Sequence, residues 1–522
     1  MPSAASYRAN EQILRLYGNG GPGYPEVAVV RLPSGQTARS AAAQITLGRA
    51  FAAVARRPGL RVASYANTRD PAFLGSDGRT TYGLVFTPFA GELAPPSLGP
   101  QITAVMRPLL PPGSQVSVTG MNELASGGQA RAGFGVLAET LLAGTAALAV
   151  LVFVFGSALA LLPLLIAAVA IPACFLALYG LAEVTTVSVV VQYLAALIGL
   201  GVAIDYSLLL VTRWREETSA GHDRQEAVIR AMATAGRSVL FSGITVAIGL
   251  LSLMVLPVPA LRSVGIGGMF VPAISVAVTL TLLPVLLATV GERVDWPRRR
   301  RPASASRAWT AWARLVVRRK WAATIAAVAV LGALGAAATG IKIGEPAARA
   351  LGTTTPAAQS LRALERAGVP AGVLDPIEIL VPSRSAAALA ARLAALPGVR
   401  TAVAPVGPAW RRGGTALVSA QPAAEPSTPG GAAVLARVRQ ATATVPGALE
   451  GGPGALLLDE NHTFYGRFPL LLAVLAAVTV VLLARAFGSL LPPVKAVVLN
   501  LASVGATCSS PSRPCPLARR PT

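Results

Sequence analysis

One acidic residue deep inside a hydrophobic segment, Asp205, has the clearest chemical potential in this sequence. It lies in the apolar run 187–212, which is long enough to cross a bilayer. Arg213 follows that run, and a helical rise of about 1.5 Å per residue places the carboxylate roughly 12 Å inside that end. A charged group at such a depth costs on the order of 2.5–3.5 kcal/mol, so it is usually retained for an ion pathway or a proton relay. Tyr206 adds a phenol that can donate a hydrogen bond to a carboxylate.

The residues around Asp205 leave two interpretations open. Asp205 either carries a proton between the two sides of the membrane or makes a static hydrogen bond between helices, worth about 0.6 kcal/mol. Tyr206 is either part of the same relay or a packing residue. Ser242 and Thr245, in the following apolar span, could line the relay, but small hydroxyl residues in membrane helices also serve packing.

Two glycines close to Asp205 favour a role in helix packing. Gly199 and Gly201 lack side chains and so permit close approach of a neighbouring helix. They do not form a nucleotide-binding loop, because the sequence contains no Gly-rich loop that ends in Lys-Ser or Lys-Thr.

The composition places these residues in a membrane protein. Hydrophobic residues make up 53% of the chain and charged residues 13%, about half of the charge that soluble proteins carry. Most of the apolar runs reach the length of ~17–25 residues that a spanning helix needs. We therefore predict a polytopic α-helical protein of the plasma membrane. The eight runs are 136–155, 158–182, 187–212, 239–256, 264–290, 322–340, 468–484 and 490–506.

The net charge of +22 could suggest a nucleic-acid-binding protein, but the distribution of charge argues against it. Basic residues are spread along the chain, with one dense block at 292–320 that holds ten Arg or Lys and two acidic residues. No basic face with interleaved aromatic residues accompanies that block, as a single-strand binder would need. Positive charge in a short loop between membrane spans instead marks the cytoplasmic side.

The polar and apolar blocks alternate along the chain. Residues 1–134 read as a compact α/β or α+β domain, and residues 341–467 show similar signals. Between the third and fourth spans, 222–237 has Ala227, Val228, Ala231 and Met232 on one side, which predicts a helix lying on the membrane surface. The expected strands are 60–65, 81–87, 115–119, 377–381 and 416–419, and the expected soluble helices are 36–57, 99–110 and 386–396.

These blocks are arranged as a duplication. The tripeptide Phe-Gly-Ser occurs at 155–157 and again at 487–489, an interval of 332 residues, each time after a polar block and one apolar span. Internal repeats are common in transporters, with the working site at the repeat interface. If 213–237 and 292–320 are cytoplasmic, both polar domains are extracytoplasmic. The excess of basic residues in the first polar domain does not contradict this location, because long domains are exempt from the positive-inside rule.

Four segments, in the same order as in the family, resemble transporters of the mycobacterial membrane protein large (MMPL) family, a branch of the resistance-nodulation-division superfamily. The string GLGVAIDYSLLLVTRWREE at 199–217 resembles the family signature. Residues 242–253 and 279–296 resemble the next two helices, and residues 7–21 resemble a piece of the first extracytoplasmic domain. The resemblance extends from about residue 5 to residue 506.

The resemblance implies a fold of twelve helices in two repeats of six, each repeat with a porter domain between its first and second helices. It also implies that protons flow inward through Asp-Tyr pairs on the fourth and tenth helices and drive export of lipids or other hydrophobic compounds. Asp205 and Tyr206 match the first pair, and Tyr206 is expected to partner the carboxylate of the second pair.

Compared with that pattern, we expect the first helix and the last three helices to be missing, together with the second Asp-Tyr pair. The domains then expected are 1–134 and 341–467 as porter-like domains, 135–291 as a five-helix bundle, 292–320 as a basic loop, and 321–340 and 468–506 as one and two further spans. The tail 507–522 changes composition to Pro, Ser, Arg and Cys, which favours a frameshift over a natural short tail. The chain would then not pump by itself, so a non-transporting remnant is the alternative.

Two other classes of function are less well supported. An intramembrane aspartyl protease needs two carboxylates in one site, and no second membrane-embedded Asp is present, so we predict no enzyme. A receptor or scaffold of the same superfamily would not need an intact Asp-Tyr pair. His222 and His462 lack partners at metal-ligand spacing, so we expect neither a metal nor a cofactor other than the proton. Glu139 is expected at the membrane interface, and the oligomeric state is left open.

Overall fold

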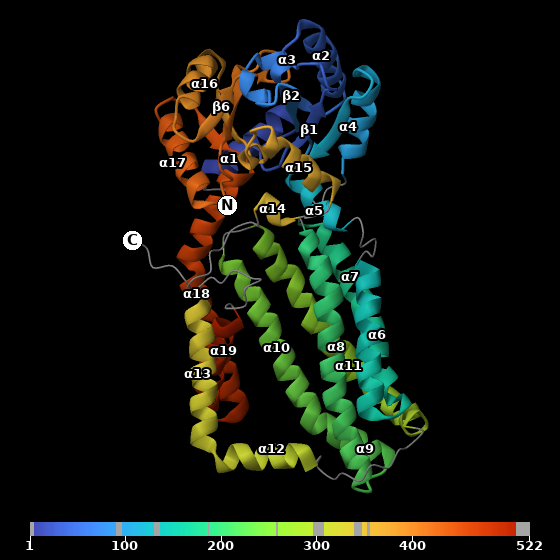
Figure 1. The fold of residues 1–522 in the computed structure, drawn as a ribbon. Coiled ribbons are helices and arrows are strands. Elements are labelled where there is room, and N and C mark those ends of the chain that lie inside the picture. The colour runs from blue at the N-terminus through green and yellow to red at the C-terminus, as the bar shows by residue number, and fades with distance from the viewer. Residues whose placement is uncertain are drawn as a thin grey trace. The chain divides into compact units, whose positions relative to one another are not determined.

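The computed structural model describes residues 5–89, 97–129, 136–185, 187–256, 259–295, 307–338, 347–351 and 355–507. The chain forms two compact units. Unit 1 consists of residues 1–133 and 344–463, and unit 2 consists of residues 134–343 and 464–522. The polar blocks build unit 1, and the apolar helices build unit 2 (Figure 1).

Unit 1 contains two antiparallel sheets with the same topology. The strand orders are β2-β3-β1-β4 and β6-β8-β5-β9, so in each sheet the first strand in the chain becomes a central strand. A short β7 pairs with β8. The first sheet consists of β1 (Glu26–Arg31), β2 (Arg61–Ser64), β3 (Thr80–Phe86) and β4 (Gln115–Thr119). The second consists of β5 (Ile377–Pro382), β6 (Val399–Val403), β7 (Arg411–Arg412), β8 (Thr415–Pro422) and β9 (Leu449–Gly451).

Helices cover each sheet and bury its apolar side chains. Helices α2 (Ala41–Ala55) and α4 (Gly99–Met106) pack on the first sheet, and α16 (Ala386–Ala394) and α17 (Pro429–Ala443) pack on the second. Ser40 caps α2, since its hydroxyl accepts a hydrogen bond from the amide of Ala43 at 3.3 Å. The five expected strands and three expected soluble helices are confirmed within a few residues.

The two halves of unit 1 exchange helices. Helix α1 (Ala5–Tyr17) precedes the first sheet but packs against β9 of the second. Helix α15 (Pro356–Arg366) precedes the second sheet but packs against β4 and α5 (Met121–Gln129) of the first half. The Asn10 side chain of α1 accepts a hydrogen bond from the amide of Gly452 at 2.8 Å and donates one to its carbonyl at 3.4 Å. The two halves therefore form one body.

A buried carboxyl, Glu26, lies at the start of the central strand β1 and is 3% exposed. Its Oε2 has no hydrogen-bond partner among the described residues. Burial, reinforced by the negative charge of Glu123, raises the pKa of Glu26 well above its usual value. The folded state therefore holds a proton that the unfolded chain releases, and the free energy of unfolding falls as pH rises above the ordinary Glu pKa.

We expect Glu26→Gln to remove this pH dependence, because glutamine resembles the protonated acid. The variant should be more stable than the wild type at pH 8, by about 1–3 kcal/mol, and similar at pH 4. Thermal unfolding of the full chain in nanodiscs at both pH values measures the difference. Equal stability of the two proteins at pH 8 would show that ionisation of Glu26 does not destabilise the folded state.

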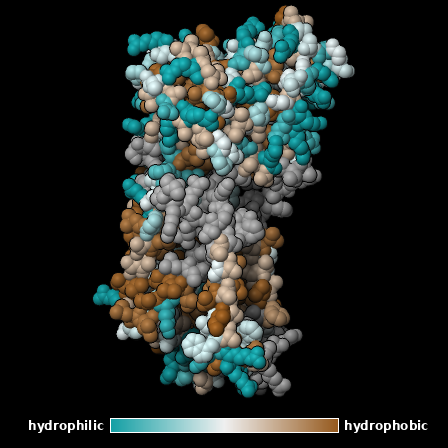
Figure 2. All heavy atoms as spheres, turned by 60° about the vertical axis from the view of Figure 1, so that its left-hand side comes forward, coloured by the Kyte–Doolittle hydropathy of each residue, from teal (hydrophilic) through white to brown (hydrophobic). Residues whose placement is uncertain are grey.

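Unit 2 is a set of apolar helices, and its outer surface is rich in hydrophobic side chains (Figure 2). Five helical stretches of the described residues are long and apolar enough to cross a membrane: 158–182, 190–219, 224–255, 261–291 and 453–485. The polytopic membrane architecture is thus confirmed. The apolar helices, including those outside these five stretches, are α6 (Val136–Phe155), α7 (Leu161–Ala182), α8 (Val189–Ser219), α10 (Arg237–Leu251), α11 (Pro259–Val294), α13 (Lys320–Ala338), α18 (Pro453–Phe487) and α19 (Leu491–Thr507).

Corresponding features recur 332 residues apart, which supports the duplication. Helix α6 ends at Phe155 and α18 ends at Phe487. The following glycines, Gly156 and Gly488, have φ angles of 61° and 62°, a left-handed conformation that favours glycine at a helix end. The same interval separates Gly120 from Gly452, which directly follow β4 and β9, and both have positive φ.

The structure describes two of the predicted segments in more detail. The segment 222–237 is helical, and α9 (Arg224–Ala231) continues through a π-helical stretch (Met232–Gly236) into α10; its place on the membrane surface stays a prediction. Its apolar side, including the buried Ala227 and Ala231, packs into the same core as residues of α8 and α11. The block 292–320 is not only a loop, since it contains α12 (Arg307–Arg318). The predicted tail lies outside the described residues, apart from Thr507.

Candidate functional site

Helix α8 positions the candidate relay residues. Ser188 caps its start by accepting a hydrogen bond from the amide of Val190 at 3.4 Å, and the apolar run that follows packs against α7 and α11. Asp205 and Tyr206 lie near the middle of this helix. Consecutive residues on a helix point about 100° apart, so the two side chains face different directions.

The structure places the two side chains in different environments. Tyr206 is 5% exposed and lies in a cluster with Val239 and Val276, so its ring faces α10 and α11. Asp205 is exposed, and the described residues provide it with neither an ion pair nor a hydrogen bond. A carboxylate at this level of an apolar helix needs a partner or a proton, because it is expensive to keep ionised in a bilayer.

The hydroxyl group of Tyr206 is buried and has no hydrogen bond of normal geometry among the described residues. It interacts with the side chain of Ser242 on α10, but the arrangement falls short of a hydrogen bond. A buried hydroxyl without a partner costs about 1–3 kcal/mol. The structure therefore brings Ser242 of α10 close to the buried hydroxyl group of Tyr206.

Thr245 is placed differently from Ser242. Its hydroxyl donates a hydrogen bond to the carbonyl of Phe241 at 2.8 Å, one turn earlier in its own helix. Such bonds to the preceding turn are the usual resting state of a threonine in a membrane helix. No contact of Thr245 with Tyr206 or Asp205 is found among the described residues, so its role in lining the relay stays a prediction.

The glycines differ in how closely they are packed. Gly199 is buried, and a Cβ added there would lie 3.6 Å from Ile171 and from Val271, an ordinary contact. Gly201 has no described atom within 4 Å of that position, so its packing role stays a prediction. Sequence reasoning missed Gly243, where a Cβ would overlap the side chain of Val276 and lie 3.7 Å from the Tyr206 ring. Its position directly after Ser242 was the available signal.

We expect Gly243→Ala to displace Val276 and the Tyr206 ring and to destabilise unit 2 by about 1–3 kcal/mol. The matched control is Gly201→Ala, where the added methyl group meets open space. Since alanine favours a helix over glycine by up to about 1 kcal/mol, the control should be neutral or slightly stabilising. Thermal unfolding of both variants in nanodiscs distinguishes them. Equal effects would mean that α10 and α11 are not in close contact at Gly243.

Ion pairs fix the end of α8 that follows the relay. Trp214 is buried against Gly291 of α11, where a Cβ would lie 2.9 Å from its ring. Arg213 pairs with Glu217 at 2.5 Å, and Arg215 pairs with Asp295 at 3.0 Å. The Arg213–Glu217 pair lies within α8, whereas Trp214 and Arg215 hold this end of the helix against α11 and the residue that follows it.

The comparison with known proteins identifies the family. Residues 1–322, which include α8 and the relay candidates, match the model of the MMPL family. The chain belongs to the MMPL family. The resemblance of the segment around Asp205 is thereby confirmed, and MMPL proteins form part of the resistance-nodulation-division superfamily.

Three curated relatives show how far the similarity extends. The putative membrane protein SCO6666 of Streptomyces coelicolor is 35% identical over 365 residues, which cover 69% of this chain and 50% of that protein. The mycolic acid-containing lipids exporter MmpL11 of Mycolicibacterium smegmatis is 33% identical over 385 residues, covering 70% and 40%. The heme uptake protein MmpL11 of Mycobacterium tuberculosis is 33% identical over 387 residues, covering 70% and 39%. The chain thus spans half or less of the length of these relatives.

Metal binding is a second kind of chemistry that His, Cys, Asp and Glu side chains can support. Within the described ranges, no group of three or more His, Cys, Asp or Glu side chains lies close enough to hold a metal ion. Nδ1 of His222 lies 3.1 Å from the backbone carbonyl of Glu217, to which it can only donate, and 3.2 Å from the Glu217 carboxylate, which is a structural contact at the end of α8. The relay candidates on α8 and α10 are therefore the best-supported site in this MMPL chain.

Proposed function

We propose that this MMPL protein takes part in proton-driven transport of a hydrophobic compound across the plasma membrane, with Asp205 as the proton carrier. The observation that carries the proposal is the position of Asp205. It is the only acidic residue in the interior of the five described spans, since the other carboxylates of these stretches lie near their ends. A lone carboxylate at that depth marks an ion or proton pathway by default.

A proton would be taken up and released by Asp205 as follows. The neutral acid is compatible with an apolar surrounding, and the carboxylate needs water or a donor. Asp205 would take up a proton from one side of the membrane and release it to the other side. Because the two protonation states favour different surroundings, each step would change the packing around α8. Tyr206, with its unsatisfied hydroxyl, and Ser242 form the polar pair that can change partners in that cycle.

The class of cargo rests on two of the relatives. One is named as an exporter of mycolic acid-containing lipids and the other as a heme uptake protein, and both cargos are hydrophobic. We propose a lipid or a similar hydrophobic molecule as the substrate, with export as the direction. No second Asp or Glu lies in the interior of the described spans, which argues against an intramembrane aspartyl protease.

We further propose that both sheets of unit 1 are extracytoplasmic and that α12 lies at the cytoplasmic surface. Helix α12 exposes Trp312, Leu315 and Val317, while Arg314 and Arg318 lie one helical turn apart. Apolar and aromatic residues together with arginines are typical of a helix that lies at the membrane interface. The positive charge around α12 favours the cytoplasmic side.

Transport by reconstituted protein tests this proposal. The chain is placed in proteoliposomes with a fluorescent lipid and, in parallel, with heme, and a pH gradient is applied. To supply the length that the relatives have beyond this chain, the same assay is run on a chimera in which residues 1–322 replace the matching part of a full-length relative. Movement of lipid that requires the gradient supports the proposal. No gradient-dependent movement of either cargo by the chimera would favour a scaffold, a receptor or a non-transporting remnant.

A further inference from the structure

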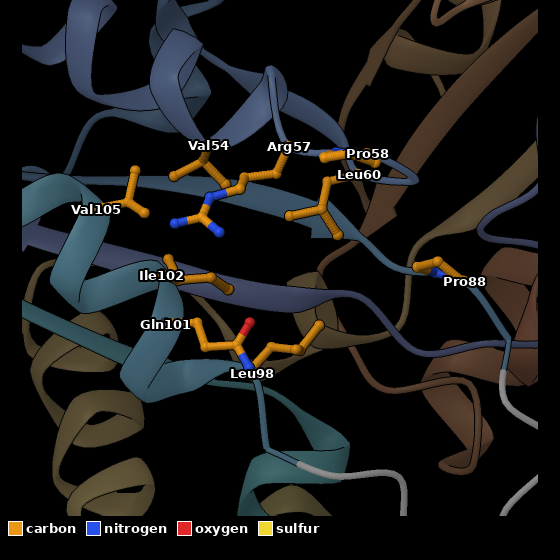
Figure 3. Close-up of a pocket in the computed structure, with 9 residues that line it drawn as sticks. All are labelled: Val54, Arg57, Pro58, Leu60, Pro88, Leu98, Gln101, Ile102 and Val105. Atoms are coloured by element: carbon orange, nitrogen blue, oxygen red, sulfur yellow. The ribbon is translucent and has the colours of Figure 1, made fainter.

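Unit 1 has a hollow between α2 and α4 that no part of the proposed transport uses. Its volume is about 270 Å³, close to the lower end of ligand-binding pockets. Figure 3 shows that α2 and α4 border it, together with the chain that follows α2 and the chain that follows β3. The hollow lies in unit 1 and does not involve Asp205, so an inference about it does not rest on the proposed function.

The walls of the hollow are apolar. Val54 of α2 and Ile102 of α4 are buried and form its inner side. Leu60 and Leu98 point into the space from opposite sides, and Val105 lies further along α4 (Figure 3). Such walls bind an apolar ligand because burial of its surface gains about 25 cal/mol of free energy per Å².

The hollow has few polar side chains, and the only charge among its lining residues is positive. The guanidinium group of Arg57 extends from the end of α2 into the space above Ile102, and Gln101 projects from the first turn of α4 (Figure 3). Among the described residues, Arg57 has no ion pair and no side-chain hydrogen bond, and none of the residues that line the hollow is acidic. Glu123 is near the start of α4, but its carboxylate already accepts from the amide of Gly99 at 2.8 Å and the hydroxyl of Ser97 at 2.5 Å.

From this arrangement we infer that the hollow binds a medium-chain carboxylate, such as a free fatty acid. One guanidinium neutralises one negative charge and matches the two oxygens of a carboxylate. The amide of Gln101 can donate a further hydrogen bond. A volume of about 270 Å³, near the lower end for ligand pockets, favours a medium alkyl chain over a large lipid.

Photolabelling of the full chain in lipid nanodiscs tests this inference. The probe is decanoic acid that carries a diazirine near its end, and labelled peptides are mapped by mass spectrometry. Labels should appear on α2 and α4 and should be displaced by decanoate but not by decylamine. Arg57→Gln should weaken the apparent affinity about tenfold or more, because a charge-assisted hydrogen bond is lost.

The neighbouring arginine provides a matched control. Arg56 and Arg57 are both exposed, but only Arg57 lines the hollow, so Arg56→Gln removes the same charge and should leave labelling unchanged. Val105→Trp fills the hollow from α4 and should abolish labelling of α2. Equal labelling of the wild type and Arg57→Gln, or equal competition by decanoate and decylamine, would show a crevice that does not recognise the carboxylate and would overturn the inference. The outcome does not depend on any transport by Asp205.

Discussion

Asp205→Asn is expected to reduce gradient-dependent transport to the level of vesicles without protein. Asparagine has nearly the same size and keeps a polar group, but it cannot take up or release a proton. A static hydrogen bond, worth about 0.6 kcal/mol, would be largely preserved by the amide, so the substitution separates the two interpretations of Asp205. The measurement is the rate of lipid movement by the chimera in proteoliposomes with an imposed pH gradient.

The control for this substitution lies on the same helix. Glu216→Gln also removes one carboxylate from α8, but Glu216 is exposed and pairs with Arg213 at the end of the helix, at 2.9 Å. That variant should transport at nearly the wild-type rate. Tyr206→Phe should give an intermediate rate, because it removes the buried hydroxyl and keeps the ring that packs against Val239 and Val276. If Asp205→Asn transports as well as Glu216→Gln, Asp205 is a structural residue.

The second large effect is expected at the ion pair that joins the two halves of unit 1. Arg61 of β2 and Glu378 of β5 are 0% and 1% exposed, and their side chains are 2.6 Å apart. The guanidinium group lies over the rings of both Phe86 and Trp410, at 4.2 and 4.3 Å from their centres. Glu378 also accepts a hydrogen bond from the amide of Gly21 at 2.7 Å.

We expect Glu378→Gln to destabilise unit 1 by about 3–5 kcal/mol, because it leaves the Arg61 charge buried without its counter-ion. For a unit of this size the loss corresponds to a fall in melting temperature of roughly 6–20 °C. Limited proteolysis of the full chain in nanodiscs during a temperature ramp reports the unfolding of unit 1 separately from unit 2.

An exposed ion pair of the same unit serves as the comparison. Arg349 and Glu365 are 2.7 Å apart, with the Arg349 side chain 73% exposed, so Arg349→Met should cost no more than about 1 kcal/mol. The double variant of Arg61→Met with Glu378→Met should recover part of the loss, since both charges are gone. Equal melting temperatures for Glu378→Gln and Arg349→Met would contradict the role of the buried pair.

Local patterns were sufficient to predict much of the fold. The alternation and turn residues around Gln115–Thr119 predict β4, and the long apolar runs predict the helices of unit 2. The central strand β1 was not predicted, because the short run EVAVVR is buried over nearly its whole length and has no clear alternation. The exchange of α1 and α15 depends on contacts such as that of Asn10 with Gly452, more than 400 residues apart, which no local pattern contains.

The candidate site was predictable to the level of residue type. A carboxylate in an apolar run stands out because a charged group inside a bilayer has a high free-energy cost, so Asp205 could be found from the sequence. The burial of Tyr206 against α10, and the close approach at Gly243, depend on how three helices pack, which spacing within one helix does not determine. The packing of Ala227 and Ala231 has the same origin, because the apolar side of 222–237 predicts burial but does not say whether a membrane or another helix covers it.

Proton movement is the quantity that tests the central claim most directly. A pH-sensitive dye inside proteoliposomes of the chimera reports proton flow when a lipid substrate is added, in the wild type and in Asp205→Asn. We expect substrate-dependent proton flow in the wild type and only the background leak in the variant, with both proteins inserted to the same extent. Substrate-dependent proton flow of equal size in the two proteins would contradict the assignment of Asp205 as the carrier.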